Sequence, residues 1–100
     1  MLAQPDLSVV LVMDVSNTMT YAFGDKTRLQ AAQEAGNNFL DKFAANSIGV
    51  NATRKIGFVA FNSNAHPIFG LTPIADNDAR DSLKKKMVDE TNNIVNAAGY

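Results

Sequence analysis

The chain has 100 residues, 46% of them hydrophobic, and a formal net charge of −1 at pH 7. This composition is enough to build the core of one small domain, and a charge so close to zero argues against a nucleic-acid partner or an anionic membrane surface. The absence of cysteine excludes disulfides and thiolate chemistry, and no stretch approaches the ~20 apolar residues that a membrane-spanning helix needs.

The first predicted element is a strand at residues 7–13. Six of these seven residues are apolar, several are β-branched, and Pro5 and Asp14 bound the run. A run of this kind is too short for a convincing helix and is typical of a strand that is buried on both faces.

Directly after this strand, the sequence Asp14-Val-Ser16-Asn-Thr18 places a carboxylate and two hydroxyls at every second position. In extended backbone, such residues point the same way, and the carboxyl ends of strands are where open α/β sheets bind ligands. Oxygen donors suit a hard cation such as Mg²⁺, with Mn²⁺ or Ca²⁺ as alternatives. The motif therefore predicts a divalent metal site, although the same residue types are also ordinary turn and cap residues.

After a loop at residues 21–25, the segment Thr27-Arg-Leu-Gln30 has the form of a capping box and begins an amphipathic helix that ends near Asn46. Residues 54–61 form a second apolar strand, and residues 65–69 form a short third one. Because Pro67 cannot donate a backbone hydrogen bond, this third strand is expected at an edge of the sheet.

The last third of the chain is predicted to be helical. Asp76 is the expected N-cap, and acidic residues at the start and lysines at residues 84–86 complement the helix dipole. The polar run at residues 89–93 predicts a break, after which a further helix starts at Ile94. The order of elements predicts an α/β fold: a partial doubly wound, Rossmann-like sheet of two parallel strands and an antiparallel edge strand, flanked by helices.

Three segments together resemble the amino-terminal half of a von Willebrand factor A-type (vWA) domain. They are Asp14-Val-Ser-Asn-Thr-Met19 after the first strand, the helix start with Arg28-Leu29 and Ala31-Ala32, and the strand Ile56-Gly-Phe-Val-Ala-Phe61. The resemblance covers nearly the whole chain. It implies that residues 1–100 are a single partial vWA-like domain, half of a vWA fold, which stops before the family's fourth strand.

In that family, an Asp-x-Ser-x-Ser motif forms a metal-ion-dependent adhesion site. The resemblance therefore assigns metal contact to Asp14, Ser16 and Thr18, with threonine in place of the last serine. The family's next metal ligand is a threonine in a later loop, and Thr91 is the matching position, without the glycines that often precede it.

One carboxylate and two hydroxyls leave a divalent cation with net positive charge and open positions, which a carboxylate from a partner can fill. We therefore expect a non-enzymatic adhesion or assembly module that binds an Asp or Glu of a partner protein, with no direct membrane insertion. On resemblance alone, the expected location is extracellular or at the cell surface. A bare first strand is also expected to pair with another segment or with a second copy, as a strand-paired or swapped homodimer.

Two other functions stay open. A strand followed by Asp-x-Asp-x-Thr characterises phosphotransferases of the haloacid-dehalogenase type, but Ser16 occupies the second acidic position and cannot shuttle a proton at neutral pH. A structural module with an empty metal site is the third alternative. Tyr21 and Phe23, beside the predicted metal loop, are either partner contacts or side chains that fold over the helix.

Overall fold

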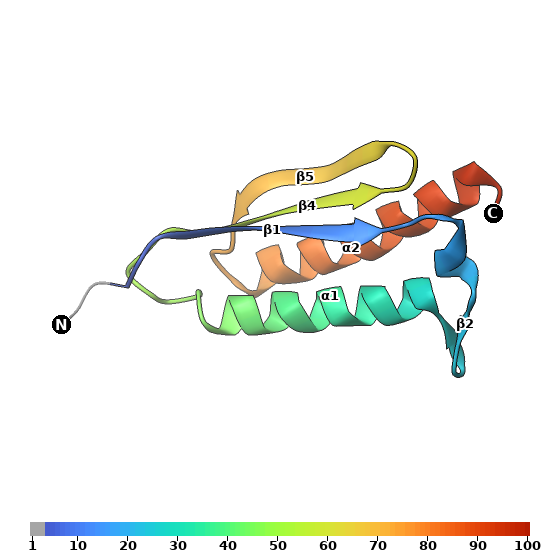
Figure 1. Cartoon of the computed structure of the whole chain (residues 1–100). Coiled ribbons are helices and arrows are strands. Elements are labelled where there is room, and N and C mark those ends of the chain that lie inside the picture. Colours follow the sequence, from blue (N-terminus) through green and yellow to red (C-terminus); the bar gives the residue numbers. More distant parts are fainter. Residues whose placement is uncertain (1–3) are drawn as a thin grey trace.

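Residues 4–100, the part of the chain that the computed structural model describes, form a three-stranded sheet with two long helices against it (Figure 1). The elements are β1 (Leu7–Asp14), α1 (Arg28–Ala45), β4 (Arg54–Phe61), β5 (Ala65–Pro73) and α2 (Asn77–Ala98). The strand order is β1-β4-β5, with β1 parallel and β5 antiparallel to β4. The predicted pair of parallel strands with an antiparallel edge strand is confirmed.

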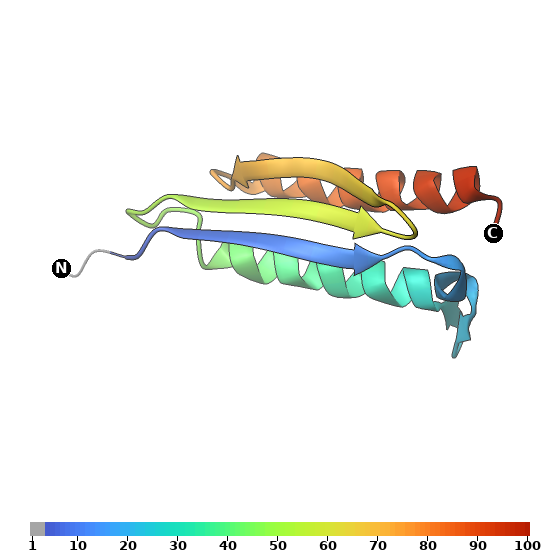
Figure 2. The ribbon, with the colours of Figure 1, turned by 45° about the horizontal axis from the view of Figure 1, so that its top comes forward.

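The connection between β1 and α1 contains more regular structure than the predicted loop. A 3₁₀ helix, η1 (Asn17–Thr20), is followed by a small hairpin of β2 (Ala22–Phe23) and β3 (Lys26–Thr27). Gly24 in its turn has φ +67°, a conformation that glycine adopts without steric cost. Both views show this hairpin extending past the first turn of α1 (Figures 1 and 2).

Both long helices begin where the sequence predicts. The Thr27 hydroxyl accepts a hydrogen bond from the Gln30 amide at 3.1 Å, and the Gln30 side chain accepts one from the Thr27 amide at 2.8 Å, which completes the capping box of α1. The Asp76 carboxylate accepts a hydrogen bond from the Ala79 amide at 2.8 Å and so caps α2.

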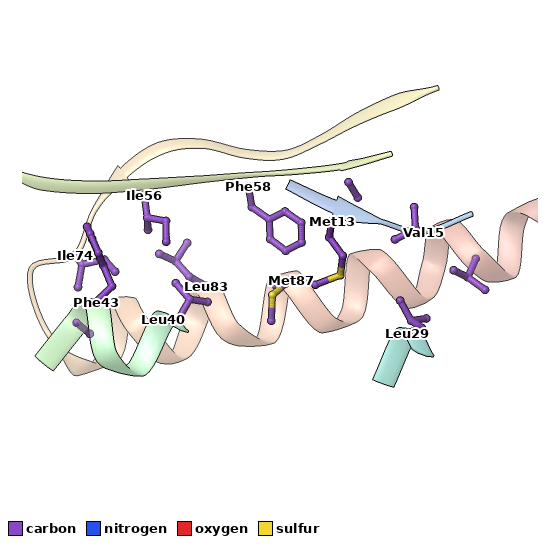
Figure 3. Packing of buried hydrophobic residues seen from close by; sticks show 13 residues of the cluster. Met13, Val15, Leu29, Leu40, Phe43, Ile56, Phe58, Ile74, Leu83 and Met87 are labelled. Atoms are coloured by element: carbon purple, nitrogen blue, oxygen red, sulfur yellow. The ribbon is translucent and has the colours of Figure 1, made fainter. Parts of the chain in front are cut away.

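The core lies between the sheet and the two helices (Figure 3). Phe58 of β4 is fully buried at its centre, and its ring meets that of Phe69 edge to face, with 5.9 Å between the centroids. Leu40 of α1 and Met87 of α2 are also fully buried. Within residues 4–100, one cluster of buried residues joins β1, β4 and both helices, so it fixes the sheet on the helix layer.

The prediction that the first strand is buried on both faces is wrong. Met13 is 9% exposed, whereas Val10 is 52% and Val12 is 65% exposed. The reason is that α1 and α2 both lie on one face of the sheet, as Figures 1 and 2 show, and residues 4–100 place no helix on the other. The second helix layer of a doubly wound fold is therefore not seen within this range.

The predicted break at residues 89–93 is also wrong, because α2 continues through them to Ala98. Met87, Thr91 and Val95 are buried at helical spacing, while the polar residues around Thr91 face solvent. The polar run is thus the outer face of one helix. No helix within residues 4–100 is long and apolar enough to cross a lipid bilayer.

Within the described residues, β1 pairs on one side only, and the run from residue 7 to residue 13 has no charge or proline to protect its free edge. The opposite edge strand, β5, contains Pro67 and Pro73. Unprotected apolar edges pair with other chains. We expect concentration-dependent self-association through β1, which Val12→Lys weakens by roughly tenfold because lysine disfavours edge pairing.

Light scattering on fractions from size-exclusion chromatography, over a range of protein concentrations, measures this effect. Leu71→Lys, which introduces the same charge at an exposed apolar position of β5, is the matched control and should leave the association unchanged. A wild-type chain that stays monomeric at every concentration contradicts this prediction.

Candidate metal site

The loop that follows β1 is anchored by two apolar side chains. The Val15 amide donates a hydrogen bond to the Phe61 carbonyl at 2.7 Å, which extends the pairing of β1 with β4, and the Val15 side chain is fully buried. Met19 packs against the core four residues later. The loop is therefore held by β4 at Val15 and by the core at Met19, with Ser16 and Thr18 between these two anchors and Asp14 just before the first.

Asp14 supplies the only carboxylate of the predicted metal motif. Its Oδ1 accepts a hydrogen bond from the Ser16 amide at 2.8 Å, which is the geometry of an Asx turn. Its Oδ2 accepts no hydrogen bond from the rest of residues 4–100. One oxygen therefore shapes the loop, and the other makes no hydrogen bond within residues 4–100.

The two hydroxyls of the motif face one another. Ser16 Oγ and Thr18 Oγ1 are 3.4 Å apart. Adjacent ligands at right angles around a cation are separated by about 2.9 Å for Mg²⁺ and by about 3.5 Å for Ca²⁺, given their usual ligand distances. The spacing is close to the Ca²⁺ value and longer than the Mg²⁺ value, so the hydroxyls, which are also within hydrogen-bonding distance of each other, would have to move closer together to share Mg²⁺.

The polar residues of this loop could also serve as ordinary helix-cap and turn residues, and the structure tests this for Ser16. Ser16 stands at the N-cap of η1, where a serine side chain often bonds to the backbone, but it makes no such hydrogen bond. The capping interpretation therefore applies to one oxygen of Asp14 and not to the Ser16 hydroxyl.

Only part of this loop has the extended backbone that the sequence pattern predicts. Ser16 is extended, with φ −72° and ψ 173°, but Thr18 lies within η1, so the three side chains do not project from one extended strand. The tight 3₁₀ turn brings the Thr18 hydroxyl back beside that of Ser16. The two hydroxyls thus lie close together through a turn that the alternating pattern does not indicate.

Thr91 lies in a different environment from the one predicted. It belongs to α2 rather than to a loop and is fully buried. Its hydroxyl donates to the Met87 carbonyl at 2.7 Å and accepts from Gln33 Nε2 at 2.9 Å. The Thr91 hydroxyl already donates one hydrogen bond and accepts another. We therefore leave Thr91 out of the metal ligands proposed below.

Gln33 was not identified from the sequence as an important residue. It is 6% exposed, and its amide also donates to the Asn92 side chain at 2.8 Å, so it links α1 to α2 through the interior. The available signal was one amide on the otherwise apolar face of the predicted helix, between Leu29 and Gly36.

Thr91→Val is expected to lower the free energy of unfolding by about 1–3 kcal/mol, because the buried Gln33 amide loses a partner while the shape is kept. Denaturant unfolding measures this loss, and calorimetry should show an unchanged Mg²⁺ affinity. Thr72→Val, which removes a hydroxyl bonded to the Gly70 carbonyl at the exposed edge strand, is the control. Weakened Mg²⁺ binding at unchanged stability would instead assign Thr91 to the metal site.

Residues 4–100, this loop included, contain no group of three or more His, Cys, Asp or Glu side chains that could hold a metal ion. The acidic residues near the start of α2 do not form such a group, and Asp76 among them serves as the N-cap. The candidate site is therefore one carboxylate with two hydroxyls.

Comparison with known proteins adds one finding. A family model described as von Willebrand factor type A domain matches residues 9–98, a range that begins within β1 and ends at the last residue of α2. It includes the loop at residues 14–18, most of β1, and all of α1, β4, β5 and α2. A search of curated proteins finds no match.

Proposed function

Because this chain belongs to the von Willebrand factor type A domain family, whose members are generally metal-dependent protein-interaction modules, we propose that it binds an acidic partner residue through a divalent cation. Asp14, Ser16 and Thr18 are the proposed ligands. The observation that carries this proposal is the arrangement of the loop: Ser16 leaves its capping role unfilled and faces Thr18 beside a carboxylate with one unused oxygen.

The charge and number of the metal ligands determine which chemical group of a partner the site binds. Asp14 provides a single negative charge, and Ser16 and Thr18 provide neutral oxygens. A bound divalent cation supplies net positive charge and coordination positions beyond these three. The buried Val15 and the packed Met19 hold the loop in place, so little ordering of the chain opposes binding. A partner carboxylate offers both the missing charge and a further oxygen.

Metal binding and partner binding are therefore coupled, and each raises the affinity of the other by the same factor. A test uses two five-residue peptides, Gly-Gly-Glu-Gly-Gly and its Gln analogue, both acetylated at the N-terminus and amidated at the C-terminus, titrated into the chain and followed by NMR. We expect the Glu peptide to bind in Mg²⁺ and its binding to be lost in EDTA. We expect the Gln peptide not to bind in either condition. Equal binding of the Glu peptide in EDTA contradicts a metal-dependent function and supports a structural module with an empty site.

The phosphotransferase alternative gains no support from the loop geometry, because the position of the second catalytic carboxylate is filled by Ser16, whose hydroxyl lies against that of Thr18. Hydrolysis of p-nitrophenyl phosphate in Mg²⁺ separates the two classes. We expect none; turnover that Asp14→Asn abolishes would replace the binding proposal with an enzymatic one.

A further inference from the structure

The first turn after the metal loop exposes two aromatic side chains. Tyr21 is 50% and Phe23 is 62% exposed, so neither is buried against α1, although the Tyr21 ring lies beside Arg28, the first residue of that helix. The Tyr21 amide donates to the Thr18 carbonyl at 3.1 Å, which joins this aromatic residue directly to a proposed metal ligand. Exposed aromatic residues therefore begin where the metal loop ends.

A cation lies beside these rings. The guanidinium carbon of Arg28 is 5.5 Å from the centroid of the Tyr21 ring, and the Arg28 amide donates to the Tyr21 carbonyl at 3.0 Å. The Arg28 side chain is exposed and makes no ion pair within residues 4–100. The ring thus holds a positive charge that no carboxylate of the described chain neutralises.

The position of Arg28 is unfavourable for α1 itself. It is the first residue of that helix, where the helix dipole favours an acidic side chain and disfavours a cation. Helix initiation does not require it, since Thr27 and Gln30 form the capping box. Within residues 4–100 the Arg28 guanidinium contacts the Tyr21 ring but no carboxylate, so an acidic group of a partner can pair with it.

We propose that Tyr21, Phe23 and Arg28 form a second contact for the partner whose carboxylate completes the metal site, an inference that rests on the function proposed above. The partner is a protein segment with a second acidic residue near the metal-bound one and an apolar side chain between or beside them. Arg28 presents a fork of donors that matches a carboxylate, and Phe23 presents apolar surface. Aromatic and arginine side chains are also the residues most enriched at binding hot spots.

The test compares two peptides, Gly-Phe-Glu-Gly-Glu-Gly and Gly-Phe-Glu-Gly-Gln-Gly, both acetylated at the N-terminus and amidated at the C-terminus, by NMR titration in Mg²⁺. The two acidic residues in the first peptide are two positions apart, so they project to the same side in extended backbone. We expect the peptide with two Glu residues to bind about fivefold more tightly, as one additional exposed ion pair allows. Arg28→Gln should make the two affinities equal within about twofold.

Two control variants sharpen the result. Lys86→Gln removes the same charge from an exposed position of α2 that makes no ion pair within residues 4–100, and it should keep the preference. Arg28→Lys keeps the charge but loses the planar fork, so it should retain only part of the preference.

The outcomes distinguish this inference from the proposed function. If the wild-type chain binds both peptides equally in Mg²⁺, or if the preference survives in Arg28→Gln, the second contact is wrong while the metal-dependent function stands. If neither peptide binds in Mg²⁺, both are wrong.

Discussion

Asp14→Ala is expected to lower Mg²⁺ affinity by on the order of 100-fold or more, because it removes the only negative charge among the proposed ligands and leaves two neutral hydroxyls. Calorimetric titration with Mg²⁺ measures the loss. The variant also removes the hydrogen bond from the Ser16 amide, which should reduce the free energy of unfolding by about 1 kcal/mol and leave the chain folded.

Two further variants separate charge from loop geometry. Asp14→Asn keeps an acceptor for the Ser16 amide but removes the charge, so it should lose Mg²⁺ binding with little change in stability. Asp25→Ala removes an exposed carboxylate from the neighbouring hairpin and should leave Mg²⁺ affinity unchanged. Equal Mg²⁺ affinity in wild type and Asp14→Ala would show that the cation, if bound, lies elsewhere.

Phe58→Ala is expected to lower the free energy of unfolding by about 3–5 kcal/mol. Phe58 is fully buried where β4 meets both helices, and its removal leaves a cavity beside the Phe69 ring. Small domains have a stability of about 5–15 kcal/mol, so this single change removes a large part of it. Urea unfolding followed by circular dichroism measures the difference.

Phe23→Ala is the matched control, because Phe23 is 62% exposed and its truncation should change stability by less than about 0.5 kcal/mol. A loss at Phe58 no larger than that at Phe23 would contradict the packing described here. Together with the Asp14 variants, these changes should separate stability from metal binding, since each affects mainly one of the two properties.

Local sequence patterns predicted the elements well where the determinant is itself local. The capping box at Thr27, the N-cap at Asp76 and the edge position of the strand with Pro67 depend on neighbouring residues, and the structure confirms each. The two wrong predictions concern which faces of a strand or a helix are buried. An apolar run such as residues 7–13 does not reveal whether helices pack on one face of the strand or on both. The polar run at residues 89–93 predicts a break in the helix, and only the burial of Thr91 shows that the run is the outer face of a continuous helix.

For the candidate site, the sequence indicated which residues to consider but not the backbone of the loop. The spacing of Asp14, Ser16 and Thr18 predicted that all three side chains project from extended backbone, whereas the two hydroxyls are brought together by a 3₁₀ turn in a loop anchored by Val15 and Met19. Thr91 was assigned from family spacing alone, and its bond to Gln33 on another helix could not be read from either segment separately.

The central claim is that a divalent cation binds at the loop of residues 14–18. Paramagnetic Mn²⁺, added in substoichiometric amounts to the ¹⁵N-labelled chain, broadens the amide signals nearest to where it binds. We predict selective broadening of the amides of residues 14–19, while those near the acidic start of α2, residues 76–81, stay sharp. Broadening centred on residues 76–81, or uniform weak broadening with no centre, would contradict the account.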